Sequence, residues 1–257
     1  MSKNKKNRSF SAYEKSHLSK HGLTSTELNK YGEMPVEYIT GFVDFMGLEL
    51  VVNNQVLIPR VETEELAEMA QKIIMKHWQT QKRPLKIADI GTGSGAIVLA
   101  MADFCLQKKL EASFVASDVS SNALRVAAAN LQRFPTLKKL IRLEKSDLMS
   151  DFSDETFDLV TANLPYIPSG RIRHLDASVK DYEPWLALDG GEDGLKLISE
   201  LIPQLAVHLV TGGEAILEVD CFHNEKILLE IKGIEAFALT MVKDSFSKSR
   251  FVILKKL

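Results

Sequence analysis

The chain has 257 residues, of which 45% are hydrophobic and 26% charged, and its formal net charge at pH 7 is −2. These values are ordinary for a globular protein that buries a sizeable core, and the balanced charge disfavours a nucleic acid as the main partner. The two cysteines and six histidines have no metal-ligand spacing, so we expect no metal site. No signal segment or membrane-spanning apolar run is evident. We therefore expect a cytoplasmic protein that binds neither a membrane nor, directly, a nucleic acid.

The N-terminal part predicts a short helical segment. Two short helices are expected between residues 10 and 30, and the second has a capping box in which Thr24 is the N-cap and Glu27 follows three residues later. This region contains too little apolar surface to form a core of its own. We assign residues 1–34 to this segment.

A β-hairpin and a linking helix are predicted next, over residues 35–84. The β-rich runs 38–52 and 55–58 flank Asn53-Asn54, which predicts a hairpin that turns at the two asparagines. Thr63 is then expected to cap a helix that continues to Trp78.

From residue 85 to residue 257, strands and helices alternate, which is typical of a parallel sheet covered by helices on both faces. Strands are expected at residues 85–90, 112–116, 141–143, 157–161 and 214–219. The runs 237–242 and 251–255 predict a closing hairpin. The predicted fold class is therefore α/β.

The turn after the first of these strands contains three alternating glycines, Gly91, Gly93 and Gly95, and leads into a helix that begins at Ala96. Glycines in such a turn let the backbone approach a ligand at the positive end of a helix. With Ala96 they fit a weak form of the dinucleotide-binding pattern. With Asp89 they fit fully the D-x-G-x-G-x-G pattern of S-adenosylmethionine-dependent methyltransferases. A tight turn that binds no ligand is the third interpretation, and the turn alone does not decide among them.

Three further features fall at the carboxyl ends of predicted strands, where open parallel sheets bind their ligands. Asp118 ends the second strand, and its two carboxylate oxygens can accept hydrogen bonds from the vicinal hydroxyls of a ribose. Leu148 follows the third strand, and the segment Asn163–Tyr166 follows the fourth. A ribose contact at Asp118 suits a nicotinamide cofactor and S-adenosylmethionine equally, and a helix-entry residue without a ligand is the structural alternative.

The segment Asn163–Tyr166 favours methyl transfer to a planar nitrogen, whose delocalised lone pair makes it a poor nucleophile. The Asn163 side-chain oxygen and the Leu164 carbonyl can accept hydrogen bonds from the N–H groups of an amide or an aromatic amine, which directs the lone pair toward a sulfonium methyl group. Pro165 would fix the backbone and Tyr166 would cover the site. A proline-containing strand exit with a capping asparagine is the structural alternative.

These residues resemble the HemK/PrmC family, the glutamine-N5 methyltransferases of bacterial peptide-chain release factors. The resemblance covers residues 35–257 and is carried by the segments Tyr38–Gly41, Val56–Leu66, Asp89–Gly95, Asn163–Pro168 and Asp181–Leu195. It implies a class I S-adenosylmethionine-dependent methyltransferase domain with a Rossmann-like, seven-stranded sheet whose last strand is antiparallel.

The resemblance also implies roles for individual residues. The S-adenosylmethionine site would be formed by Asp89, Gly91, Thr92, Gly93, Ser94, Gly95, Asp118, Leu148 and Asn163. The glutamine of a Gly-Gly-Gln loop in a release factor would be held by Asn163, Leu164, Pro165 and Tyr166. Of these, Asn163, Pro165 and Tyr166 would be the catalytic residues.

The sequence departs from the family pattern at four places. The family's Asn-Pro-Pro-Tyr has Leu164 at its second position, a change that keeps the backbone carbonyl, and its Pro-Glu-Thr begins here with Val61. The family's Glu-Ile-Gly…Gln after the fifth strand becomes Glu218-Val-Asp220…Asn224. The family's N-terminal helical domain, which is expected to help dock the release factor, is about twice as long as the segment here.

Two other functions remain open at this stage. Asn-Leu-Pro-Tyr also occurs in the ribosomal-RNA adenine-N6 methyltransferases, although the near-neutral charge and the segment Asp181–Leu195 argue against that function. The other is a catalytically silent S-adenosylmethionine-binding protein that docks to a partner. Leu164 and Asp220 support that hypothesis, whereas Asn163 and the glycine turn oppose it.

Overall fold

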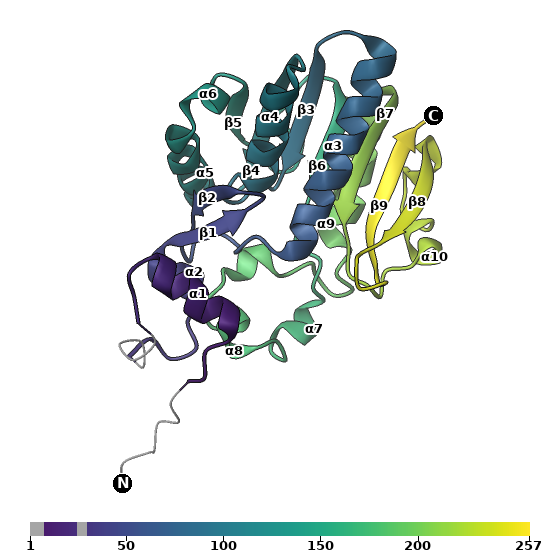
Figure 1. Cartoon of the computed structure of the whole chain (residues 1–257). Coiled ribbons are helices and arrows are strands. Elements are labelled where there is room, and N and C mark those ends of the chain that lie inside the picture. Colours follow the sequence, from purple (N-terminus) through teal and green to yellow (C-terminus); the bar gives the residue numbers. More distant parts are fainter. Residues whose placement is uncertain (1–7, 25–29) are drawn as a thin grey trace.

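A computed structural model describes residues 8–24 and 30–257, and a seven-stranded mixed sheet forms its centre (Figure 1). The strands lie in the order β5-β4-β3-β6-β7-β9-β8. Their bounds are β3 (Leu85–Ile90), β4 (Ala112–Asp118), β5 (Ile141–Lys145), β6 (Phe157–Ala162), β7 (Leu209–Glu218), β8 (Phe237–Lys243) and β9 (Ser249–Lys256). Strands β3 to β7 run parallel to one another, whereas β9 lies antiparallel between β7 and β8. The predicted α/β fold with an antiparallel last strand is confirmed.

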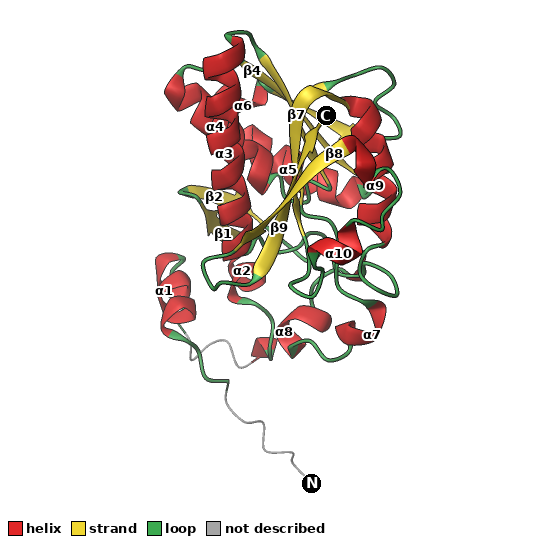
Figure 2. Cartoon of the chain, turned by 90° about the vertical axis from the view of Figure 1, so that its right-hand side faces the viewer, coloured by secondary structure: helices red, strands yellow, loops and turns green. Residues whose placement is uncertain are grey.

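Helices cover both faces of the sheet (Figure 2). The helices on one face are α3 (Val61–Gln81), α4 (Ala96–Lys108) and α5 (Ser121–Arg133), and α9 (Lys196–His208) covers the other. The buried apolar side chains form one large cluster on each side accordingly. The central strand β6 is buried over its whole length, as expected for a parallel strand covered on both faces.

Shorter helices complete the described part of the chain. They are α1 (Ala12–Lys20), α2 (Val36–Thr40), α6 (Pro135–Lys138), α7 (Ser169–Ile172), α8 (Ala177–Lys180), α10 (Glu225–Leu228) and the 3₁₀ helices Trp185–Ala187 and Ile234–Ala236. Within residues 8–24 and 30–257, no helix combines the length and the apolar character that crossing a membrane requires.

The N-terminal hairpin turns at a different place from the one predicted. Strands β1 (Phe42–Phe45) and β2 (Leu48–Val51) pair antiparallel around Met46-Gly47, whose φ angles are +48° and +82°. Two successive positive φ angles match the twist of paired strands, and glycine adopts them readily. The predicted turn at Asn53-Asn54 is wrong because Met46-Gly47 divides the first β-rich run into both strands. Residues 55–58 form no strand.

Helix α3 begins earlier than predicted, at Val61, with Arg60 as its N-cap residue. Thr63 therefore lies inside the first turn, and the prediction that it caps the helix is wrong. The residue is 3% exposed, and its side chain hydrogen-bonds to Glu218 of β7 and to Asn163, which follows β6. By contrast, helix α5 begins at a side-chain cap, because the Ser120 side chain accepts a hydrogen bond from the Ala123 N–H.

Phe10 and Leu18 of the N-terminal segment form a small apolar cluster with Val36 of α2. Helix α1 begins at a capping box formed by Ser11 and Glu14. The capping box predicted for the second helix includes Glu27, which lies outside the described residues. The division of the chain at residues 34 and 84 stays a prediction.

Candidate functional site

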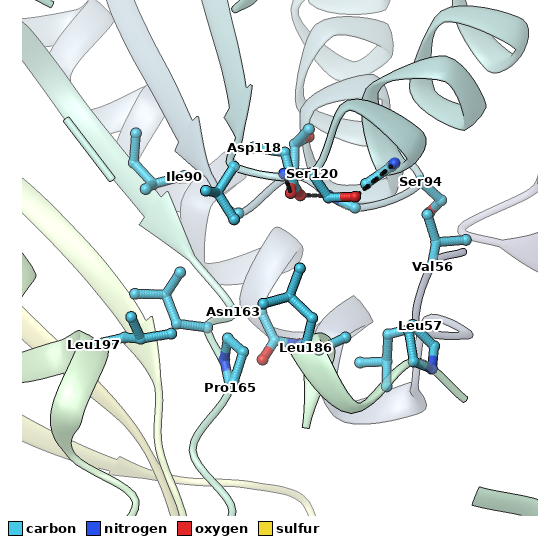
Figure 3. A pocket seen from close by; sticks show the side chains of 18 of the residues that line it. Val56, Leu57, Ile90, Ser94, Asp118, Ser120, Asn163, Pro165, Leu186 and Leu197 are labelled. Atoms are coloured by element: carbon cyan, nitrogen blue, oxygen red, sulfur yellow. Dashed lines mark hydrogen bonds between the residues drawn. The ribbon is translucent and has the colours of Figure 1, made fainter. Parts of the chain in front are cut away.

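A pocket of about 580 Å³ opens at the carboxyl ends of the parallel strands. This volume lies within the range typical of sites for small organic ligands. Figure 3 shows Asp118 and Ser120 on one side of the pocket and Asn163, Pro165 and Leu186 on the side that faces them. The walls also include residues of the segments 55–59, 90–97, 146–148, 184–187 and 196–200.

Most residues predicted for the site line this pocket. They are Gly91, Thr92, Gly93, Ser94, Asp118, Leu148, Asn163, Leu164 and Pro165. Three other predicted residues, Asp89, Gly95 and Tyr166, are not among the lining residues, and the contacts below show what they do instead. Segments that are far apart in the sequence therefore meet at one edge of the sheet.

The turn needs glycines because its backbone has positive φ angles. At Gly91 there is also no room for a side chain. The φ angles of Gly91, Gly93 and Gly95 are +71°, +56° and +83°, a region that side chains disfavour. A Cβ atom on Gly91 would lie 2.8 Å from Cδ2 of Leu164. Gly95, in turn, brings helix α4 close to Ala127 of α5. The turn is thus packed against the segment that carries Asn163.

Asp89 organises the turn from inside the protein. The residue is 1% exposed, and its carboxylate accepts hydrogen bonds from the hydroxyls of Thr92 (2.7 Å) and Thr161 (2.8 Å). Burial raises the pKa of Asp89 to about 6. Because Thr161 belongs to β6, this carboxylate connects the glycine turn to the neighbouring strand.

Asp118 joins the glycine turn to the start of α5. Its Oδ2 accepts a hydrogen bond from the Gly93 N–H (2.9 Å), and its Oδ1 accepts one from the Ser120 N–H (2.8 Å). Burial raises the pKa of this carboxyl group. Each oxygen retains a lone pair for a ligand in the pocket. The ribose-binding role of Asp118 stays a prediction.

A chain of hydrogen bonds extends from Asn163 through Thr63, which also lines the pocket, to the buried Glu218. Asn163 Nδ2 donates to Thr63 Oγ1 (3.0 Å), and the Thr63 hydroxyl donates to Glu218 Oε2 (3.3 Å). The Tyr166 hydroxyl donates to Glu218 Oε1 (2.8 Å). Because its nitrogen bonds to Thr63, the Asn163 amide keeps its oxygen for a ligand. Tyr166 supports this chain through Glu218.

Thr63 and Glu218 were not predicted as site residues. The sequence pattern predicted Thr63 as a helix cap, and Glu218 stood out only within a departure from the family pattern. One feature of the sequence could have pointed to Glu218: it lies at the end of a central strand. An acidic side chain there is costly to bury unless it is hydrogen-bonded. Burial raises the pKa of Glu218 to about 7.

The ion pair between Arg60 and Glu183 joins two walls of the pocket. The Glu183 carboxylate, whose side chain is fully buried, accepts a hydrogen bond from the Arg60 guanidinium. The adjacent residues Pro59 and Pro184 both line the pocket. Burial raises the pKa of Glu183 more than Arg60 lowers it. Both residues lie in segments that carry the family resemblance, but the sequence did not predict that they pair.

Relatives of known activity decide the family. The family model for the Methyltransferase small domain matches residues 61–177. A release factor glutamine methyltransferase of Lactococcus lactis is 35% identical over 236 residues, which is 91% of this chain and 82% of that protein. The chain belongs to the release factor glutamine methyltransferase family. A second family member, from Koribacter versatilis, is 33% identical and covers 82% of this chain and 79% of its own length.

Solved structures agree with this family at the level of the fold. A methyltransferase from Pyrococcus furiosus has a TM-score of 0.53 at 22% identity and covers 82% of this chain and 90% of its own. A 16S rRNA methyltransferase of T. thermophilus, in complex with S-adenosylmethionine and guanosine, has a TM-score of 0.56 at 17% identity and covers 84% of this chain and 50% of its own. The predicted class I methyltransferase fold is confirmed.

We expect the substitution Glu218→Gln to stabilise the protein at alkaline pH. The pKa of Glu218 is about 7 in the folded state against an ordinary value of 4.5. The stability contributed by the protonated carboxyl is therefore fully present below pH 4.5 and is lost as the pH rises through 7. A neutral glutamine avoids this loss, so at pH 8 the variant should exceed the wild type by on the order of 1–3 kcal/mol in free energy of unfolding.

Urea unfolding of both proteins between pH 5 and pH 8 measures this difference. Asp89 also titrates in this range, but it is present in both proteins and its contribution cancels. A difference in stability that is the same at every pH would contradict the expectation.

Proposed function

We propose that this protein transfers a methyl group from S-adenosylmethionine to the side-chain amide nitrogen of the glutamine in the Gly-Gly-Gln loop of a bacterial peptide-chain release factor. Membership of the release factor glutamine methyltransferase family supports this substrate and this reaction. The single structural observation that carries the proposal is the orientation of the Asn163 amide, whose oxygen is available to the pocket because its nitrogen bonds to Thr63.

The residues of the pocket fit S-adenosylmethionine. Asp118 offers carboxylate oxygens to a ribose, and Ile90, Leu148 and Leu197 offer apolar surface to a planar base. The glycine turn brings backbone close to the ligand without side chains in the way. When bound, the cofactor supplies a methyl group on a positively charged sulfur, which makes the methyl carbon electrophilic.

Asn163 and Leu164 hold the substrate amide in this proposal. The Asn163 Oδ1 and the Leu164 carbonyl oxygen accept hydrogen bonds from the two N–H groups of the glutamine side chain. This arrangement withdraws the nitrogen lone pair from amide conjugation and points it at the methyl carbon. The nitrogen held by Asn163 and Leu164 would accept the methyl group that the cofactor supplies, and sulfur would keep the electron pair of the carbon–sulfur bond that breaks. The methylated nitrogen would then lose one proton to water.

The same acceptors would also fit the exocyclic amine of adenine, which is why the identity of the substrate needs a direct test. We expect mass spectrometry of purified protein, incubated with S-adenosylmethionine and unmethylated release factor, to show the mass of one methyl group added to the Gly-Gly-Gln glutamine. Ribosomal RNA in a parallel reaction should stay unmodified. Methylated adenine, or binding of the cofactor without transfer to either substrate, would contradict the proposal.

We further propose that the protein acts in the cytoplasm and does not bind nucleic acid directly.

The substitution Asn163→Ala should lower turnover by on the order of 10²-fold or more, because it removes an acceptor that acts on the reacting nitrogen. Affinity for S-adenosylmethionine should stay within a few-fold of the wild type. Steady-state kinetics and isothermal titration calorimetry measure the two quantities. Asn54→Ala, at an exposed asparagine outside the pocket, is the matched control. Full activity of Asn163→Ala would remove the proposed mechanism.

The substitution Asp118→Ala should weaken binding of S-adenosylmethionine by about 10- to 100-fold. This range corresponds to the loss of one or two hydrogen bonds to a charged group, each of about 1.5 kcal/mol or more. Calorimetric titration measures the affinity, with Asp151→Ala at an exposed aspartate as the control. Unchanged affinity would show that Asp118 does not bind the ribose.

A further inference from the structure

We propose that Thr63 and Glu218 are positioning residues that determine which end of the Asn163 amide faces the substrate. This inference rests on the proposed function, because it concerns the same reacting amide. The three side chains come from elements that are distant in the sequence: Thr63 from α3, Asn163 from the exit of β6, and Glu218 from the end of β7. Neither Thr63 nor Glu218 has to touch the reacting atoms for this role.

The hydrogen-bond chain has a fixed direction because of what each group can donate. An ionised carboxylate only accepts hydrogen bonds, and a threonine hydroxyl has a single hydrogen. The hydroxyl of Thr63 donates that hydrogen to Glu218, so toward Asn163 it can only accept. The amide of Asn163 therefore turns its nitrogen to Thr63, at 3.0 Å, and leaves its oxygen for the pocket.

The opposite orientation would not support the reaction. If the Asn163 amide rotated by half a turn about its Cβ–Cγ bond, its NH₂ group would face the N–H groups of the substrate amide. Two donors would then oppose each other, and the substrate nitrogen would have no acceptor at that position. An isolated asparagine side chain has no strong preference between the two orientations, so a neighbouring group must impose one.

Glu218 is held in a setting where its charge responds to pH. It is 2% exposed and accepts a hydrogen bond from Tyr166 at the exit of β6. Arg250 of β9 favours its ionised form, whereas Glu62 of α3 disfavours it. Burial outweighs these contacts and raises its pKa to about 7.

Protonation of Glu218 would reverse the direction of the hydrogen bonds from Glu218 through Thr63 to Asn163. A protonated carboxyl can donate to the Thr63 hydroxyl, which can then give its own hydrogen to Asn163. The oxygen of the Asn163 amide would turn toward Thr63, away from the substrate. Turnover should therefore rise as the pH increases through about 7, where Glu218 becomes ionised.

Thr63→Val and Thr63→Ser separate positioning from packing. Valine has nearly the shape of threonine but lacks the hydroxyl, whereas serine keeps the hydroxyl and loses only a methyl group. We expect Thr63→Val to lower kcat on release factor by about tenfold or more, with the Kd for S-adenosylmethionine within about twofold of the wild type. Thr63→Ser should recover most of the turnover.

Two further variants complete the kinetic experiment. Glu218→Gln should lower kcat and remove the rise of turnover around pH 7, even where it stabilises the fold. Thr80→Val is the matched control, because Thr80 lies on the same helix and its hydroxyl bonds to backbone carbonyls of Lys76 and His77. Its turnover and pH profile should equal those of the wild type.

A spectroscopic measurement tests the same inference without substrate. In ¹⁵N-labelled protein, the side-chain NH₂ resonances of Asn163 should shift in Thr63→Val and in wild type below pH 6, but stay near the wild-type positions in Thr63→Ser. A wild type that methylates no release factor would refute the proposed function, and the resonances would still report on the hydrogen-bond chain.

Three outcomes would overturn the inference. The first is a Thr63→Val protein with the turnover and pH profile of the wild type. The second is an equal loss of turnover in Thr63→Val and Thr63→Ser together with weakened cofactor binding, which would show a purely structural role. The third is an Asn163 side-chain resonance that does not respond to the removal of the Thr63 hydroxyl.

Discussion

The parallel register of β3 against β6 is the constraint on which the rest of the site depends. It aligns Ile90 with Ala162, so the two strands end at the same level. The next residue of each chain segment, Gly91 and Asn163, then begins a loop at the same edge of the sheet. Without that register, the glycine turn and the segment with Asn163 would not face one pocket. The close approach of Leu164 to Gly91 follows from the same alignment.

Buried carboxylates maintain this edge, and each of them carries an energetic cost. Asp89 connects the glycine turn to β6, and Glu183, through its ion pair with Arg60, connects two walls of the pocket. Burial raises the pKa of both carboxyl groups, so their ionised forms are less favourable than in water. Each of these carboxylates nevertheless holds together two segments that line or support the pocket. The pocket is thus shaped by polar contacts and surrounded by two apolar clusters.

Three of the four departures from the family pattern have structural explanations here. Leu164 keeps a backbone carbonyl and fills the space above Gly91. Val61 occupies the first position of α3, a place that suits proline but accepts most residues, and its side chain is 57% exposed. Asp220 accepts a hydrogen bond from Arg171 (2.7 Å), and Asn224 caps α10. These changes therefore leave the acceptors of the proposed reaction in place.

The sequence by itself determined the alternation of strands and helices, the glycine turn and the residues at the strand ends, because these depend on short-range patterns of apolar residues, glycines and caps. Only the tertiary structure brought together Thr63 and Glu218, which are 155 positions apart and meet through the packing of α3 against β7. The same holds for the hairpin, whose turn at Met46-Gly47 has weaker local signals than Asn53-Asn54. A local sequence pattern identifies residues that can form hydrogen bonds. Which of them donates and which accepts depends on the partner that tertiary packing brings into contact.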